Sequence, residues 1–233
     1  MAEDITPSLL KAIQNDFQAR IGSNQKIKSL TSKARDGTIT YQEAHRYSIE
    51  VGNCLSKSFK NKLSSAVLPN GKMYYNIAKE IIENTLPVNY VMVSDIAVEA
   101  QIAVNKANGL GVKAVKAELD KSRLEGFINR LSEADVFDDV AWILGDPVVN
   151  FTQNVVTETV RKNAEFFEES GGRTSITRIS VGKGCDWCDE KAGTYRYGEQ
   201  PDDFFQQHEN CRCMITFDGV TFNKSKGSRM TTL

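Results

Sequence analysis

The sequence predicts an α+β protein, with a mostly α-helical body over residues 1–172 and a small β-rich module over residues 173–222. Three observations support this prediction. Apolar residues recur at helical spacing up to the glycine pair Gly171-Gly172, short segments after that pair alternate apolar and polar residues, and cysteines cluster near the C-terminal end. Residues 223–233 are polar and basic, so we expect a disordered tail there.

The first two predicted helices begin at recognisable capping signals. Thr6-Pro7 joins a capping residue to a proline at the first helical position, which predicts a helix running to about Ile21. Thr40 and Glu43 fit a capping box. Behind it, one helical face carries the apolar side chains Ala44, Tyr47, Val51, Cys54, Leu55, Phe59 and Leu63.

Proline and glycine divide the rest of the helical body. A break at residues 69–71 precedes a helix expected from Lys72 to Leu86, which Pro87 should close. The next helices are expected from Tyr90 to the glycines after Ala107, and then over residues 112–131, 136–144 and 146–170. The last of these begins at Asp146-Pro147 and stops at the glycine pair.

The β-rich module contains three strand signals. Residues 174–181 alternate isoleucine with polar residues, and GTYRYG at 193–198 is a short aromatic strand between glycines. Residues 214–222 predict a hairpin around Asp218-Gly219. About fifty residues are too few to bury a core comfortably, so the module needs a metal or a crosslink.

A cluster of metal-type ligands lies in this module. Four of the five cysteines and one of the two histidines fall between residues 185 and 213. A C-x-x-C pair followed by H-x-x-C-x-C can supply the four ligands of a tetrahedral zinc ion. A structural zinc would stabilise the module, which is too small to be stable through its core alone. The candidate ligands are Cys185, Cys188, His208, Cys211 and Cys213. Five candidates compete for four positions, and we favour Cys185, Cys188 and Cys211 for three of them. For the fourth we rank His208 above Cys213, because residues three apart in a turn converge more easily than residues two apart on a strand.

Other interpretations of the cysteines stay open. A disulfide framework needs an oxidising compartment, and residues 1–14 do not resemble a signal peptide. A thioredoxin-like redox pair needs a βαβ context and leaves His208, Cys211 and Cys213 unexplained. A catalytic zinc of the deaminase type needs an H-x-E unit ahead of P-C-x-x-C, an order that the chain lacks.

The remaining cysteine and histidine fit structural roles. Cys54 lies on an apolar helical stripe and is interpreted as a core thiol, and His45 as a solvated or packed helix residue. The chain is 40% hydrophobic and 25% charged with a net charge of −1, which indicates neither nucleic acid nor an anionic membrane as a partner. No stretch approaches the roughly 18 apolar residues of a membrane span.

Residues 182–217 resemble the C-terminal signature of the minor head proteins of tailed phages, the Mu F-like head morphogenesis family. The matching positions are Cys185, Trp187, Cys188, Ala192, Gly193, Tyr195, Tyr197, His208, Asn210, Cys211, Arg212 and Cys213. The resemblance implies a non-enzymatic structural protein of the virion head, near the portal, that acts in head morphogenesis and DNA delivery. It implies the portal and the major capsid or scaffolding proteins as partners, contact with packaged DNA, and a place in the host cytoplasm during assembly.

Two alternatives accompany this interpretation: a nucleic-acid-binding zinc module and a zinc-dependent hydrolase or deaminase. Four protein ligands would exclude the second. Trp187 and Tyr195 are expected to cover the metal with apolar surface. Arg212 either screens the thiolates or pairs with a carboxylate, and Asp189 and Glu190 are expected to be solvated.

Overall fold

The computed structural model describes residues 4–181, 186–208 and 210–222. Its helices are α1 (Thr6–Ser23), α2 (Gln25–Arg35), α3 (Tyr41–Lys62), α4 (Tyr75–Glu83), α5 (Leu86–Ala107), α6 (Lys121–Glu133), α7 (Asp146–Glu169) and α8 (Asp186–Glu190), with 3-10 turns η1 (Pro69–Gly71), η2 (Phe137–Asp139) and η3 (Ala141–Leu144). Strands β1 (Gly172–Ile179), β2 (Gly193–Arg196) and β3 (Met214–Phe222) form an antiparallel sheet in the order β2-β1-β3. The arrangement confirms the α+β prediction.

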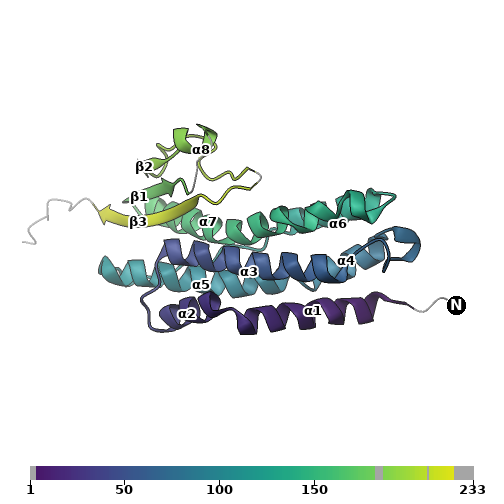
Figure 1. Ribbon diagram of the computed structural model, residues 1–233. Coiled ribbons are helices and arrows are strands. Elements are labelled where there is room, and N and C mark those ends of the chain that lie inside the picture. Colours follow the sequence, from purple (N-terminus) through teal and green to yellow (C-terminus); the bar gives the residue numbers. More distant parts are fainter. Residues whose placement is uncertain (1–3, 182–185, 209, 223–233) are drawn as a thin grey trace, which may run out of the picture.

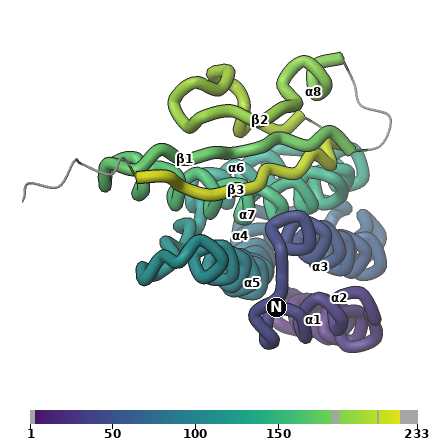
Figure 2. The backbone as a smooth tube through the Cα atoms, turned by 90° about the vertical axis from the view of Figure 1, so that its left-hand side faces the viewer, coloured from purple at the N-terminus to yellow at the C-terminus, as the bar shows by residue number. Residues whose placement is uncertain are grey.

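The elements are stacked in layers (Figure 1, Figure 2). The sheet lies on α7 and also contacts α3 and α5, which pack against α7, and α1 and α2 form the outermost layer. One apolar cluster joins Phe59 of α3 and Val160 of α7 to Ile176 and Phe217 of the sheet. The hydrophobic core therefore passes without interruption from the helices into the β-rich module.

Several helices start where the sequence signals predict. Thr40 Oγ1 accepts the backbone N–H of Glu43 at 3.2 Å, and the Glu43 carboxylate accepts the Thr40 N–H at 3.1 Å, which completes the capping box. Pro7 and Pro147 lie in the first turns of α1 and α7. Helix α2 was not anticipated; the Asn24 side chain starts it by accepting two backbone N–H groups of its first turn.

Three helix expectations are wrong. Pro87 lies in the first turn of α5 rather than closing a helix, because the missing N–H has no helical partner at that position. Residues 112–120 are not helical: the Asn163 side chain binds the N–H and the C=O of Val115, both at 2.8 Å, in place of helical hydrogen bonds. Residues 136–144 form the 3-10 turns η2 and η3 instead of a helix.

The hairpin expected around Asp218-Gly219 is also wrong. Strand β3 continues past these residues along β1, with Ile176 opposite Phe217 and Ser175 opposite Gly219. Asp218 is thus the extra residue of a β-bulge, and Gly219 adopts a φ of 152°, which favours glycine. The bulge absorbs the turn-like sequence without reversing the chain.

None of the helices in the described ranges combines the length and the apolar character that a bilayer crossing requires.

Candidate metal centre

Three cysteine side chains converge at one end of the sheet. Cys188 lies on α8, and Cys211 and Cys213 lie just before β3. Their sulfur atoms all lie within 4.8 Å of one another, and each of the three residues is at least 96% buried. The Sγ atoms of Cys188 and Cys211 are 3.9 Å apart. The three cysteines could hold a metal ion.

The sulfur spacing fits a tetrahedral cation. Thiolates bound at about 2.3 Å to a tetrahedral zinc lie about 3.8 Å apart. The observed 3.9 Å between Cys188 and Cys211 matches that edge of a tetrahedron. The soft donors select a soft or borderline cation rather than Mg²⁺ or Ca²⁺, which prefer oxygen.

His208 lies beside the cysteines. Its Nε2 atom is 2.9 Å from the Cys188 sulfur. A tight turn brings it there: the Cys211 N–H donates to the His208 carbonyl at 3.1 Å, and Asn210 adopts the left-handed conformation with a φ of 59°. Asparagine tolerates this conformation better than most residues, so the H-E-N-C sequence suits the turn.

Cys213 belongs to the sulfur cluster, although the sequence ranking placed it below His208. Cys211 and Cys213 are two residues apart just before β3, and both sulfur atoms enter the cluster. The ranking of His208 above Cys213 stays a prediction, because the His208 ring also lies beside the cysteines. Cys185, the fifth candidate, lies outside the described residues.

Arg178 of β1 lies against the cluster and was missed in the sequence. It is only 1% exposed, and one guanidinium nitrogen is 4.0 Å from the Cys211 sulfur. The same guanidinium donates to the carbonyls of Phe204 and Gln206. The sequence gives no clear signal for this position, because Ile176 and Ile179 lie on opposite faces of β1 and only the structure shows that Arg178 shares the buried face with Ile176.

Helix α7 supports the loop before β3 with a row of polar side chains. Asn150 donates to the His208 carbonyl at 3.1 Å, and Gln153 donates to the Cys213 carbonyl at 2.9 Å. Arg212 pairs with Asp146 at the start of the helix, which settles its role in favour of a carboxylate partner. The sequence pattern of this helix predicts its apolar stripe, and the role of its polar face becomes visible only in the structure.

The charges of the cysteines are unequal. A hydrogen bond from the Cys211 thiol is the main cause that lowers the pKa of Cys213 to about 5; burial opposes it, while Cys188 and the Arg178 guanidinium assist it. The same hydrogen bond is the main cause that raises the pKa of Cys211 well above its usual range, and burial is the second cause. The cluster thus readily carries one negative charge, and a bound cation would supply the field that ionises the others.

Aromatic residues cover the site unequally. Trp187 packs on the three cysteines, its ring meets His208 edge to face at 5.4 Å, and Arg178 and Lys191 lie over it at 5.1 and 4.1 Å. Tyr195 does not cover the cluster: its ring packs on Phe204 at 5.4 Å, in the main core.

The other residues weighed in the sequence lie apart from the centre. Asp189 and Glu190 are exposed, as expected. Cys54 and His45 are buried in the helical body, and His45 contacts the backbone of β3.

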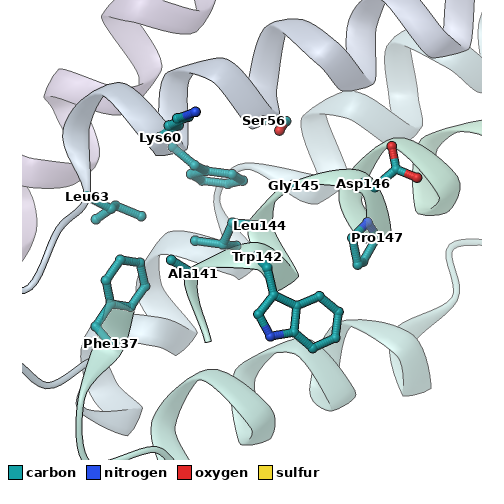
Figure 3. Close-up of a pocket in the computed structure, with 11 residues that line it drawn as sticks. Ser56, Lys60, Leu63, Phe137, Ala141, Trp142, Leu144, Gly145, Asp146 and Pro147 are labelled. Atoms are coloured by element: carbon teal, nitrogen blue, oxygen red, sulfur yellow. The ribbon is translucent and has the colours of Figure 1, made fainter. Parts of the chain in front are cut away.

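An apolar cavity of about 410 Å³ opens between α3, η3 and the start of α7 (Figure 3). Phe59, Phe137 and Leu144 line it, and the half-exposed Trp142 lies at its edge. Its ionisable lining residues in the described chain are Lys60 and Asp146, and Asp146 is engaged by Arg212. The lining also includes Ser56 of α3.

Comparison of the chain with models of protein families, with curated protein sequences and with solved structures gives no match. A function for this centre must be inferred from its donor atoms and their surroundings.

Proposed function

We propose that Cys188, Cys211 and Cys213 supply three ligands of a structural zinc ion, and that the fourth comes from His208 or Cys185. The observation that carries the proposal is the convergence of three buried sulfur atoms within 4.8 Å. Metal binding by these thiols would stabilise this part of the fold more than their packing alone can. Zinc is the cation that cysteine and imidazole together favour in a tetrahedral site.

A structural role suits this donor set better than a catalytic one. Catalytic zinc sites keep one coordination position open for water or substrate, whereas structural sites are closed by four protein ligands. Here a histidine nitrogen already lies 2.9 Å from the Cys188 sulfur, and Trp187 packs on the cysteines. The zinc would tie α8 and the loop before β3 to the sheet and to α7.

We further propose that the protein is a minor structural component of a bacteriophage head, near the portal, and that it acts by binding portal and major capsid or scaffolding proteins. Support comes from the resemblance of residues 182–217 to the minor head proteins of tailed phages. The near-zero net charge is consistent with protein partners as the main ones. Contact with packaged DNA would then be secondary.

Metal content tests the zinc site. Native mass spectrometry and elemental analysis should find about one zinc per chain. Cys188→Ser should lose the metal, while Cys54→Ser, which alters a cysteine outside the cluster, should keep it. Comparing His208→Ala with Cys185→Ala should identify the fourth ligand. Metal-free, folded protein containing disulfides would refute the proposal.

An assembly experiment tests the functional proposal. In a phage that encodes this chain, deleting the gene should leave capsid protein levels normal but yield defective or poorly infectious particles. The wild-type protein should co-sediment with heads, and purified protein should capture portal protein. Complementation with Cys54→Ser should restore infectivity, whereas Cys188→Ser should not. Absence from particles, together with zinc-dependent turnover of a nucleotide or peptide, would favour an enzyme instead.

A further inference from the structure

The cavity between α3, η3 and the start of α7 has the size of a small-molecule binding site. Its volume of about 410 Å³ lies within the range of roughly 300–1,000 Å³ that is typical of such sites. Residues of α3, η2, η3 and α7 surround it, so four elements fix its shape. Small-molecule sites are mostly apolar and carry a few polar groups that select and orient the ligand.

The walls of this cavity suit an apolar body. Phe59, Phe137, Leu144 and Pro147 line it with rings and aliphatic carbon (Figure 3). Trp142 at its edge is 50% exposed, although tryptophan is on average a highly buried residue. An aromatic or branched aliphatic ligand would cover part of this ring, and the removal of apolar surface from water would favour binding.

The charges around the cavity favour an anion. Lys60 lines the cavity and forms no ion pair with a residue that the structure describes. The carboxylate of Asp146, which also lines it, is already paired with Arg212. These three side chains together carry one net positive charge, and Arg130 of α6 adds a second one where it lies over the Trp142 ring at 5.2 Å. An anionic ligand would therefore be attracted and a cationic one repelled.

Two polar side chains of α3 can receive the negative group. Ser56 and Lys60 are four residues apart, so they are neighbours on the helix surface, and both lie across the cavity from Trp142 (Figure 3). Within the described chain the Ser56 hydroxyl has no hydrogen-bond partner. A carboxylate can accept hydrogen bonds from a hydroxyl and an ammonium at once, and charge assistance strengthens both.

We propose that this cavity binds a small apolar carboxylic acid in its ionised form. The carboxylate would lie at Ser56 and Lys60, and the apolar body would lie against Phe59 and Trp142. A free acid fits better than a peptide segment, because a peptide helix or strand needs an elongated groove or an open sheet edge, and this space is one cavity among four elements.

Isothermal titration calorimetry of the zinc-loaded full chain tests the proposal, with 2-naphthoate as the probe. We expect one site with a Kd of about 0.02–1 mM, the range that ligand efficiency gives for a molecule of this size. The neutral isostere 2-naphthamide should bind about three- to tenfold more weakly, because it cannot pair with Lys60. Lys60→Met should weaken 2-naphthoate by a similar factor and leave 2-naphthamide unchanged.

Lys57→Met is the matched control, because Lys57 is another exposed lysine of α3 and lies outside the lining. It should bind both probes as the wild type does. Ala141→Phe should abolish binding of both, since the larger side chain fills the cavity. Thermal unfolding and zinc content should match the wild type in Lys57→Met and Lys60→Met, so failure here is distinguishable from failure of the zinc proposal.

Three results would overturn the inference. The first is no binding of 2-naphthoate up to about 5 mM, well above the expected Kd. The second is equal affinity for the acid and the amide, and the third is a Lys60→Met variant that binds 2-naphthoate like the wild type. A peptide with glutamate beside phenylalanine that binds where 2-naphthoate does not would also overturn it, and would assign the cavity to a partner protein.

Discussion

Arg178 shows how one residue can balance the charge of the cysteine cluster. Burying a guanidinium costs several kcal/mol unless charge and hydrogen bonds compensate. Here the compensation comes from two backbone carbonyls, the face of Trp187 and the nearby Cys211 sulfur. The arginine therefore supplies a positive charge beside three buried cysteines that could hold a metal ion.

His45 is a second buried ionisable residue, and it fastens the sheet to the helical body. Its Nε2 atom lies 3.0 Å from the N–H and 2.9 Å from the carbonyl of Ile215 on β3. Burial lowers the pKa of His45 from 6.5 to about 4, against the opposing effect of the Ile215 hydrogen bond. The folded state therefore holds this imidazole neutral.

We predict that His45 makes the protein less stable in mild acid. Between pH 6.5 and 4 the unfolded chain binds a proton at His45 that the folded protein does not, so the free energy of unfolding should fall as the pH falls. The loss attributable to His45 should reach about 3 kcal/mol. Denaturant unfolding of wild type and His45→Gln across this range measures it. Equal pH dependence in the two proteins would contradict the prediction.

At the scale of elements, α7 has two functions. One side packs into the main core through residues such as Val156 and Val160, and its polar row holds the loop before β3. Helix α3 meets it closely: a Cβ added at Gly52 would lie 2.9 Å from the Cα atom of Val149. The glycine permits the two backbones to approach.

We predict opposite effects of alanine at two helical glycines. Gly52→Ala should lower the free energy of unfolding by about 1–3 kcal/mol, because α3 and α7 must move apart. Gly126→Ala, in α6, meets open space and should raise it by about 0.5–1 kcal/mol, because alanine favours the helix. Denaturant unfolding gives both values. An unchanged free energy of unfolding in Gly52→Ala would contradict a close contact between α3 and α7 at this position.

Across the whole molecule, the β-rich module and the helical body share one core. The rings of Phe167 on α7 and Phe217 on β3 are 5.5 Å apart, and Ile176 of β1 is fully buried in the same cluster. Among the described residues, the three cysteines of α8 and the loop before β3 form a small separate apolar cluster with Trp187. Stability within the module should therefore be uneven.

We predict that removing the metal loosens the loop but not the sheet. On treatment of the zinc-loaded protein with a chelator, hydrogen exchange should accelerate in residues 186–192 and 204–213. Backbone amides of Ile176 and Phe217 should keep their protection, because packing on α7 does not depend on the metal. Hydrogen exchange with mass spectrometry resolves these segments. Uniform loss of protection, or no change in the loop, would contradict this division.

The sequence by itself determined the features that are encoded within a few residues. The capping box of Thr40 and Glu43, the starts at Pro7 and Pro147, and the short strand before Tyr197 all depend on neighbouring residues. The gathering of cysteines and histidine was equally readable, because the candidate ligands lie close together in the chain.

Only the tertiary structure decided what depends on distant partners. The segment 112–120 is non-helical because Asn163, 48 residues away from Val115, binds its backbone. Gln153 holds the Cys213 carbonyl across 60 residues, and Arg178 reaches the Cys211 sulfur across 33. Local propensity and spacing contain no record of such contacts. They form only when packing brings distant segments of the chain together and buries polar groups that must then find partners.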